Sequence, residues 1–175
     1  MTRTVSARAS ENTPRAWLLI VLVVLILAPA VHAGIADSPL PVLVTGKKTL
    51  HLYSVLGVAS NASVATIFTC TSTDTVPQQV GVEVFGGAGG GPANDATTTS
   101  VSVVPGGTAV IETQSTTYFG VDSNLATSVG NRGSARILST SKKLACTAIV
   151  ADSSTAPPSS TWPLTIIKKI KEKGE

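Results

Sequence analysis

Apolar residues divide the chain into two regions with different patterns. An unbroken apolar run covers residues 16–28, close to the N-terminus. From residue 48 onward, apolar residues instead alternate with polar ones, in short stretches separated by clusters of Gly, Pro, Asn, Asp and Ser. Alternation with a period of two is typical of β-strands with one buried face, and the intervening residues favour turns. The pattern predicts an apolar N-terminal segment followed by an all-β domain.

The alternating region predicts about eight short strands, the pattern of a two-sheet sandwich over residues 47–170. Alternation is clearest in residues 79–85, where three valines are expected to point inward, and Gly81 and Glu83 outward. Residues 34–46 are expected to be an extended lead-in, in which residues 42–44 could form a short first strand. The predicted strands are residues 48–58, 64–71, 79–85, 98–104, 108–113, 134–140, 144–151 and 162–170, with 118–121 as a further short candidate. In the first of these, alternation places Leu50, Leu52, Ser54 and Leu56 on one face and His51, Tyr53 and Val55 on the other.

The N-terminal region has the features of a secretory signal peptide. Three arginines precede the apolar run, and the run ends in small residues that fit the pocket of a signal peptidase. We predict cleavage between Ala33 and Gly34, with a second candidate site at residues 28–30. The alternative is an uncleaved membrane anchor, but a spanning helix needs about 20 apolar residues, and the run has 13. The arginines are Arg3, Arg8 and Arg15.

Cleavage at this site changes the charge of the protein. The full chain has 13 Lys and Arg against 10 Asp and Glu, a net charge of +3. Three arginines and Glu11 leave with residues 1–33, which leaves 10 basic against 9 acidic residues and a net charge of +1. The remaining domain is nearly neutral, so its charge does not favour nucleic acid as a partner. After cleavage, contact with the membrane is not expected either.

Both cysteines, Cys70 and Cys146, lie in predicted strands beyond the signal segment. Export to an oxidising compartment favours a disulfide between them. Such a bond would close a loop of 75 intervening residues. Loop entropy would then contribute about 4 kcal/mol to stability. We interpret the bridge as a link between the two sheets of the sandwich. The alternative is two free, buried thiols that act as small apolar residues.

The hairpin over residues 100–108, with Pro105 and Gly106 in its turn, and a cysteine on both an early and a late strand resemble the immunoglobulin-like and fibronectin type III-like domains of exported bacterial proteins. The resemblance covers roughly residues 48–169. It implies a single antiparallel β-sandwich and brings no activity, cofactor or ligand with it. The fold expected for the whole chain is an all-β, immunoglobulin-like sandwich that follows an N-terminal signal helix.

Two sets of residues are candidates for catalysis. His51 is the only histidine after residue 33, and a serine nucleophile needs such a base, oriented by a carboxylate. No Gly-x-Ser-x-Gly motif accompanies it, so a partly exposed histidine on a strand face is the favoured interpretation. Glu83 and Glu112 could form a carboxylate pair, but alternation predicts that both face solvent. No catalytic residue is therefore predicted.

Four further features are candidates for binding or modification. Asp122 begins a calcium-loop-like segment that lacks an oxygen ligand and a glycine, so no metal site is predicted. The basic tail, residues 171–175, and the preceding Lys168 and Lys169 are expected to protect a strand edge rather than contact anionic lipid or polysaccharide. Asn61 begins a glycosylation acceptor sequence. The glycine-rich loop lacks the Lys and Ser/Thr of a phosphate loop and is a candidate contact loop. Its glycines are Gly86, Gly87, Gly89, Gly90 and Gly91.

These observations predict a non-catalytic exported β-sandwich, periplasmic or extracellular. It would act as a structural or binding module with a partner in the envelope or outside the cell, and no cofactor is expected. One alternative is a subunit that assembles by strand exchange and donates residues 42–44. The other is a hydrolase with a site near His51.

Overall fold

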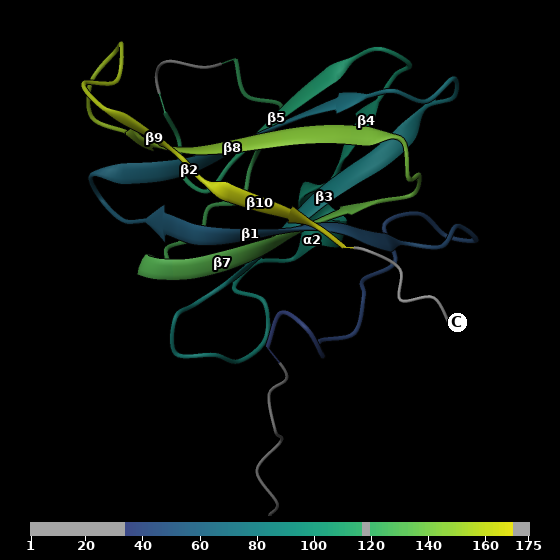
Figure 1. Cartoon of the computed structure of the whole chain (residues 1–175), viewed down its shortest axis with the longest axis horizontal. Helices are drawn as coiled ribbons and strands as arrows, with labels where there is room; N and C mark the ends of the chain where they lie inside the picture. Colours follow the sequence, from purple (N-terminus) through teal and green to yellow (C-terminus); the bar gives the residue numbers. More distant parts are fainter. Residues whose placement is uncertain (1–33, 117–119, 170–175) are drawn as a thin grey trace, which may run out of the picture. The chain divides into compact units, whose positions relative to one another are not determined.

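The computed structural model describes residues 34–116 and 120–169, and these form an all-β sandwich of two five-stranded sheets (Figure 1). The predicted signal segment and the tail beyond Lys169 lie outside the described residues, as do Tyr118 and Phe119 of the short strand candidate. Within the described ranges, no helix has the length and hydropathy to cross a membrane.

The first sheet has the strand order β10-β1-β7-β3-β4, and all its strands are antiparallel. The second has the order β6-β5-β2-β8-β9, in which only the β5–β6 pair is parallel. The ten strands exceed the predicted eight, and four of them are only two to four residues long. The strands of the first sheet are β1 (Leu50–Ser60), β3 (Gln78–Phe85), β4 (Val101–Val103), β7 (Gly130–Ser139) and β10 (Thr165–Lys168). Those of the second are β2 (Val64–Ser72), β5 (Thr108–Glu112), β6 (Ser123–Asn124), β8 (Leu144–Asp152) and β9 (Thr161–Pro163).

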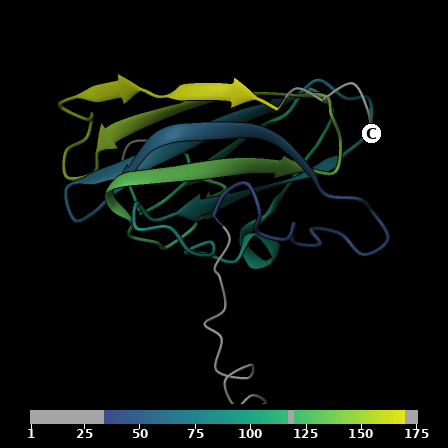
Figure 2. The same cartoon turned by 60° about the horizontal axis from the view of Figure 1, so that its bottom comes forward.

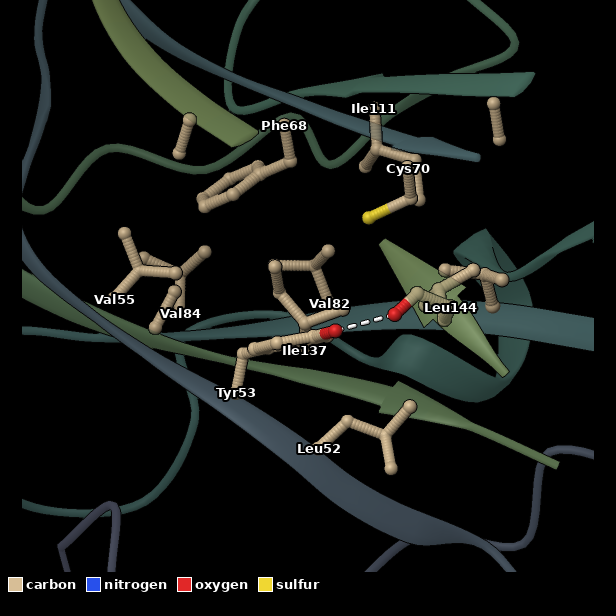
Figure 3. Packing of buried hydrophobic residues seen from close by; sticks show 14 of the residues in the cluster. Leu52, Tyr53, Val55, Phe68, Cys70, Val82, Val84, Ile111, Ile137 and Leu144 are labelled. Carbon is tan, nitrogen blue, oxygen red and sulfur yellow. Dashed lines mark hydrogen bonds between the residues drawn. The ribbon is translucent and has the colours of Figure 1, made fainter. Parts of the chain in front are cut away.

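The inner faces of the two sheets enclose one apolar core (Figure 3). Val82 and Ile137 contribute from the first sheet, and Phe68 and Ile111 from the second, and all four are almost fully buried. The hydroxyl of Tyr53 crosses between the sheets and donates a hydrogen bond to the carbonyl of Leu144. The three valines of β3 point into this core, as alternation predicts.

The Cys70–Cys146 disulfide is present, but it does not link the two sheets. The two cysteines are directly opposite each other on β2 and β8, which are neighbours in the second sheet. Their Cα atoms are 4.2 Å apart, the spacing of an antiparallel pair without mutual backbone hydrogen bonds. The prediction of an inter-sheet bridge was therefore wrong, because period-two alternation gives the face of a residue but not the sheet it belongs to.

The lead-in, residues 34–46, contains no strand and packs across the outer face of the first sheet; we call it the strap. Leu43 of the strap packs against Ala96 and Leu138 of the domain. Ala96 begins α2 (Ala96–Thr99), a single turn capped by Asp95, whose carboxylate accepts a hydrogen bond from the amide of Thr97. Figure 2 shows the strap and α2 on the same side of β7.

The structure corrects three further predictions. Gly81 and Glu83 do point away from the core, but they are buried, because the strap and α2 cover that face. The predicted strand 98–104 begins inside α2 and is reduced to β4. The predicted strand 162–170 is two strands, because the chain leaves the second sheet after β9 and joins the first as β10 (Figure 1).

A β-bulge changes the faces of β1. His51 pairs with Leu138 of β7 and Tyr53 pairs with Ile137, so Leu52 is an extra residue. Both Leu52 and Tyr53 enter the core, whereas alternation placed them on opposite faces. A bulge shifts the alternation of every residue beyond it.

Candidate functional site

A surface depression lies at the end of the sandwich where β3 leaves the first sheet and β7 enters it. It has a volume of about 500 Å³ and is open to solvent. One wall is the glycine-rich loop after β3, and the other is formed by residues 128–132 at the start of β7. We call it the glycine cleft. Its lining includes Gly86, Gly87, Gly89 and Gly91 of the predicted contact loop, but not Gly90.

Glycine is required at specific points of this loop. A Cβ atom at Gly87 would lie 2.3 Å from the carbonyl oxygen of Arg132, so only glycine allows the two walls to approach. Gly89 has φ +80° and Gly90 φ +101°, a region that favours glycine. The structure therefore gives three glycines of the predicted contact loop a steric or conformational reason.

Asn94 fixes the far end of the glycine loop to β3. Its side-chain oxygen accepts from the amide of Val84 and its nitrogen donates to the carbonyl of Val82, each at 2.8 Å. The side chain thus continues the ladder of β3 beyond β4, which pairs only with residues 78–80. Sequence reasoning did not single out Asn94, because a cross-loop contact of this kind has no local pattern.

Arg132 is the only ionisable side chain that lines the glycine cleft. The other polar groups are Ser128, Asn131 and the backbone of the glycines. The hydroxyl of Ser128 donates to the carbonyl of Ser60. The side-chain oxygen of Asn131 accepts from the side-chain amide nitrogen of Asn61 at 2.6 Å. The cleft can therefore offer hydrogen bonds and one positive charge. The guanidinium of Arg132 carries hydrogen-bond donors and no acceptor, so the cleft offers no general base.

The second depression, of about 430 Å³, lies on the outer face of the first sheet, between the strap and β10. His51 and Ser54 are in it, and His51 Nε2 is 3.1 Å from Ser54 Oγ. Burial, followed by the positive charges of Lys169 and Arg136, lowers the pKa of His51 below its usual value. The pair has no orienting carboxylate among the charges that act on His51 in the described structure. The sequence indicated His51 as a candidate but not Ser54, because alternation places the two residues on opposite faces of the strand. The bulge at Leu52 brings both side chains to the outer face.

The candidate carboxylate pair is not brought together. Glu83 and Glu112 lie on the outer faces of opposite sheets, since their neighbours Val82 and Ile111 both point into the core between the sheets. Both glutamates are nearly fully buried, so the prediction that they face solvent was wrong. Glu112 accepts hydrogen bonds from the amide and hydroxyl of Thr116, and burial raises the pKa of its carboxyl.

Glu83 forms a buried ion pair with Arg136 of β7, beneath the strap. The guanidinium also donates to the carbonyls of Ser38 at 2.8 Å and Pro39 at 2.7 Å, and it lies 5.3 Å from the ring centre of Phe85. Buried charges need such partners. Arg136 therefore fastens the strap to the sheet and is not free for chemistry.

The calcium-loop-like segment that begins at Asp122 has structural contacts. Asp122 accepts a hydrogen bond from the amide of Val110, and Asn124, two positions later, donates to the hydroxyl of Ser115. No three His, Cys, Asp or Glu side chains are placed to hold a metal ion within residues 34–116 and 120–169.

No protein-family model, curated protein or solved structure matches the chain.

Proposed function

We propose that the chain is exported and acts as a non-catalytic β-sandwich binding module in the envelope or outside the cell. The partner contact is assigned to the glycine cleft. The observation that carries the proposal is the composition of this cleft, which offers backbone groups and one arginine. We also keep the immunoglobulin-like resemblance as part of the proposal, at the level of architecture.

Export is supported by two independent features. The arginine-flanked apolar run and the small residues before Gly34 are the pattern of a cleaved signal. The Cys70–Cys146 bond is of a kind that persists in oxidising compartments and is rare in the cytosol. Neither feature depends on the other, because the first lies in the leader and the second in the domain.

Binding at the glycine cleft is supported by its size and its construction. A volume of about 500 Å³ falls within the range of ligand sites. Loops held by a rigid scaffold are the usual place for contact residues. Here the scaffold is the end of β3 and the start of β7, which pair over six residues from Val80 to Phe85. Open glycine backbone and Arg132 suit a polar partner that accepts hydrogen bonds.

The test is saturable binding of the exported protein to isolated cell envelopes, measured by co-sedimentation. Ala88→Trp would fill the cleft and Arg132→Ala would remove its charge, and each is expected to weaken binding at least tenfold. Lys142→Ala is the matched control, because Lys142 is exposed in the turn at the other end of β7. Equal binding of all four proteins, or no binding by the wild type, would contradict the proposal.

A hydrolase site is the second candidate, and the His51–Ser54 hydrogen bond is the observation that favours it. A neutral imidazole next to a hydroxyl is the first half of an acyl-transfer site. On this alternative, the exported protein would hydrolyse activated esters, and both His51→Ala and Ser54→Ala would abolish the activity. If the wild-type protein hydrolysed esters no faster than the Ser54→Ala variant, the hydrolase alternative would be rejected.

A further inference from the structure

The depression beside His51 brings residues from three segments to one place. Ser54 is directly opposite Ile167 of β10 on one side and Arg136 of β7 on the other, so their side chains share the outer face of the sheet. The bulge after His51 turns its ring to this same face, next to Ser54. Bulges of this kind often re-aim a side chain beside a functional site.

The walls of this depression are apolar. Ile35 and Ala36 of the strap form one side, and Ile167 of β10 forms the other. Ile167 is half exposed to solvent, although it lies within a strand. Apolar walls around a few polar groups are the usual composition of a small-molecule site.

The charges at this depression are mainly positive. Lys168 and Lys169 line its rim, and neither forms an ion pair with any residue of the described structure. Lys169 is close enough to His51 to lower the pKa of the ring, as is Arg136 from beneath the strap, where Glu83 pairs with it. The strap contributes one acidic residue, Asp37, which is exposed and does not contribute to the shift of His51.

We propose that this depression binds a single-chain amphiphile with a carboxylate head. The head lies at the ammonium of Lys169 and the hydroxyl of Ser54, and the chain lies between Ile35 and Ile167. The ammonium of Lys169, which has no ion pair within residues 34–116 and 120–169, supplies the charge complement. The apolar walls supply the surface that the chain covers. The site is distinct from the glycine cleft, which lies at the start of β7 and shares no lining residue with it.

The ring of His51 provides a direct readout of this proposal. The chain has two histidines, and cleavage before Gly34 leaves His51 as the only one. A bound carboxylate stabilises the protonated imidazole, so its pKa should rise when the ligand binds. The same coupling requires that the ligand bind more tightly as the pH falls through the pKa of His51.

The experiment is an NMR titration of the His51 ring protons in the exported protein with octanoate, kept below its micelle-forming concentration. Octanoate should shift the signals saturably and raise the pKa of His51. Acetate, which has the head but no chain, should bind at least tenfold more weakly. Octylammonium, which has the chain but the opposite charge, should leave the pKa of His51 unchanged or lower it.

Variants of surface lysines complete the test without threatening the fold. Lys169→Ala should weaken octanoate binding at least tenfold, Lys169→Arg should restore it, and Lys142→Ala should behave as the wild type. The proposal is overturned if octanoate causes no saturable shift, or if octylammonium binds as tightly as octanoate. Loss of envelope binding in the cleft variants would leave this result unaffected, so the two proposals fail separately.

Discussion

The buried Arg136–Glu83 pair gives the most direct test of how the strap is held. We consider Arg136→Met, which keeps most of the side-chain volume but removes the charge. The two side chains are 1% and 5% exposed, so solvent screening is small. Removal of one partner from a buried ion pair costs about 3–5 kcal/mol, because the other charge remains buried. We expect this loss in the free energy of unfolding at neutral pH.

Part of the loss comes from the strap itself. Arg136 donates to the carbonyls of Ser38 and Pro39, and these acceptors lose a charged donor in the variant. The loss of these two hydrogen bonds should weaken the attachment of the strap to the sheet. We therefore expect the amide of Leu43, which donates to Thr49 Oγ1 in the native strap, to exchange its hydrogen faster in Arg136→Met.

Urea unfolding followed by circular dichroism, with the disulfide intact, measures the loss. The double variant Glu83→Met with Arg136→Met is the control, because it leaves no buried charge and should be more stable than Arg136→Met alone. A loss below about 1 kcal/mol for Arg136→Met would refute this account of the pair. So would strictly additive effects of the two substitutions.

Three further predictions concern stability. Replacement of Cys70 and Cys146 together by Ser should lower the free energy of unfolding by about 4 kcal/mol, since the bond joins residues 76 positions apart; an unchanged urea midpoint would count against this. Gly87→Ala should cost about 1–3 kcal/mol, because its Cβ would overlap a backbone carbonyl, whereas Gly91→Ala has open space and serves as the control. Glu112 has a raised pKa, so the folded state holds its proton more tightly and stability should fall as the pH rises above about 4.5. Glu112→Gln should therefore stabilise the protein more at pH 7 than at pH 4 in thermal unfolding, and equal effects at both pH values would exclude this coupling.

The sequence predicts the class of fold well, because alternation is a local property. The three valines of β3 and the inward set of β8 follow it directly. It fails where distant chain segments cover a strand. The outward positions of β3 look solvent-facing in the pattern, yet Glu83 is buried there, because the strap returns from some 45 residues earlier in the chain. No local sequence pattern distinguishes a buried glutamate on a regular strand from an exposed one. The burial of Glu83 requires a basic partner, and that partner, Arg136, comes from another strand.

For the same reason, the sequence predicts only one part of each candidate site. The glycine run marks a loop, but its second wall comes from residues 128–132, about 40 positions later. The lone histidine draws attention, but its partner Ser54 depends on a bulge. Tertiary packing determines where a strand bulges and which outer face another segment covers. The hydrophobic periodicity of the sequence therefore predicts neither. The disulfide shows the same limit. The bond between Cys70 and Cys146 was predictable from the sequence, but the position of both cysteines in one sheet was not.

Assembly by strand exchange stays a prediction. The strap is docked on its own domain through Leu43, whereas exchange would require residues 42–44 to leave it. Light scattering over a range of concentrations would support exchange only if the mass increased with concentration.

Export is the central claim, and the N-terminus and thiols of the exported protein test it most directly. N-terminal sequencing of protein recovered from the periplasm or medium, with thiol counting after denaturation without reductant, gives both in one preparation. We expect a chain that begins at Gly34 and has no reactive thiol, because Cys70 and Cys146 are joined. A chain that keeps residues 1–33 and stays in the cytoplasm with two reactive thiols would contradict the account.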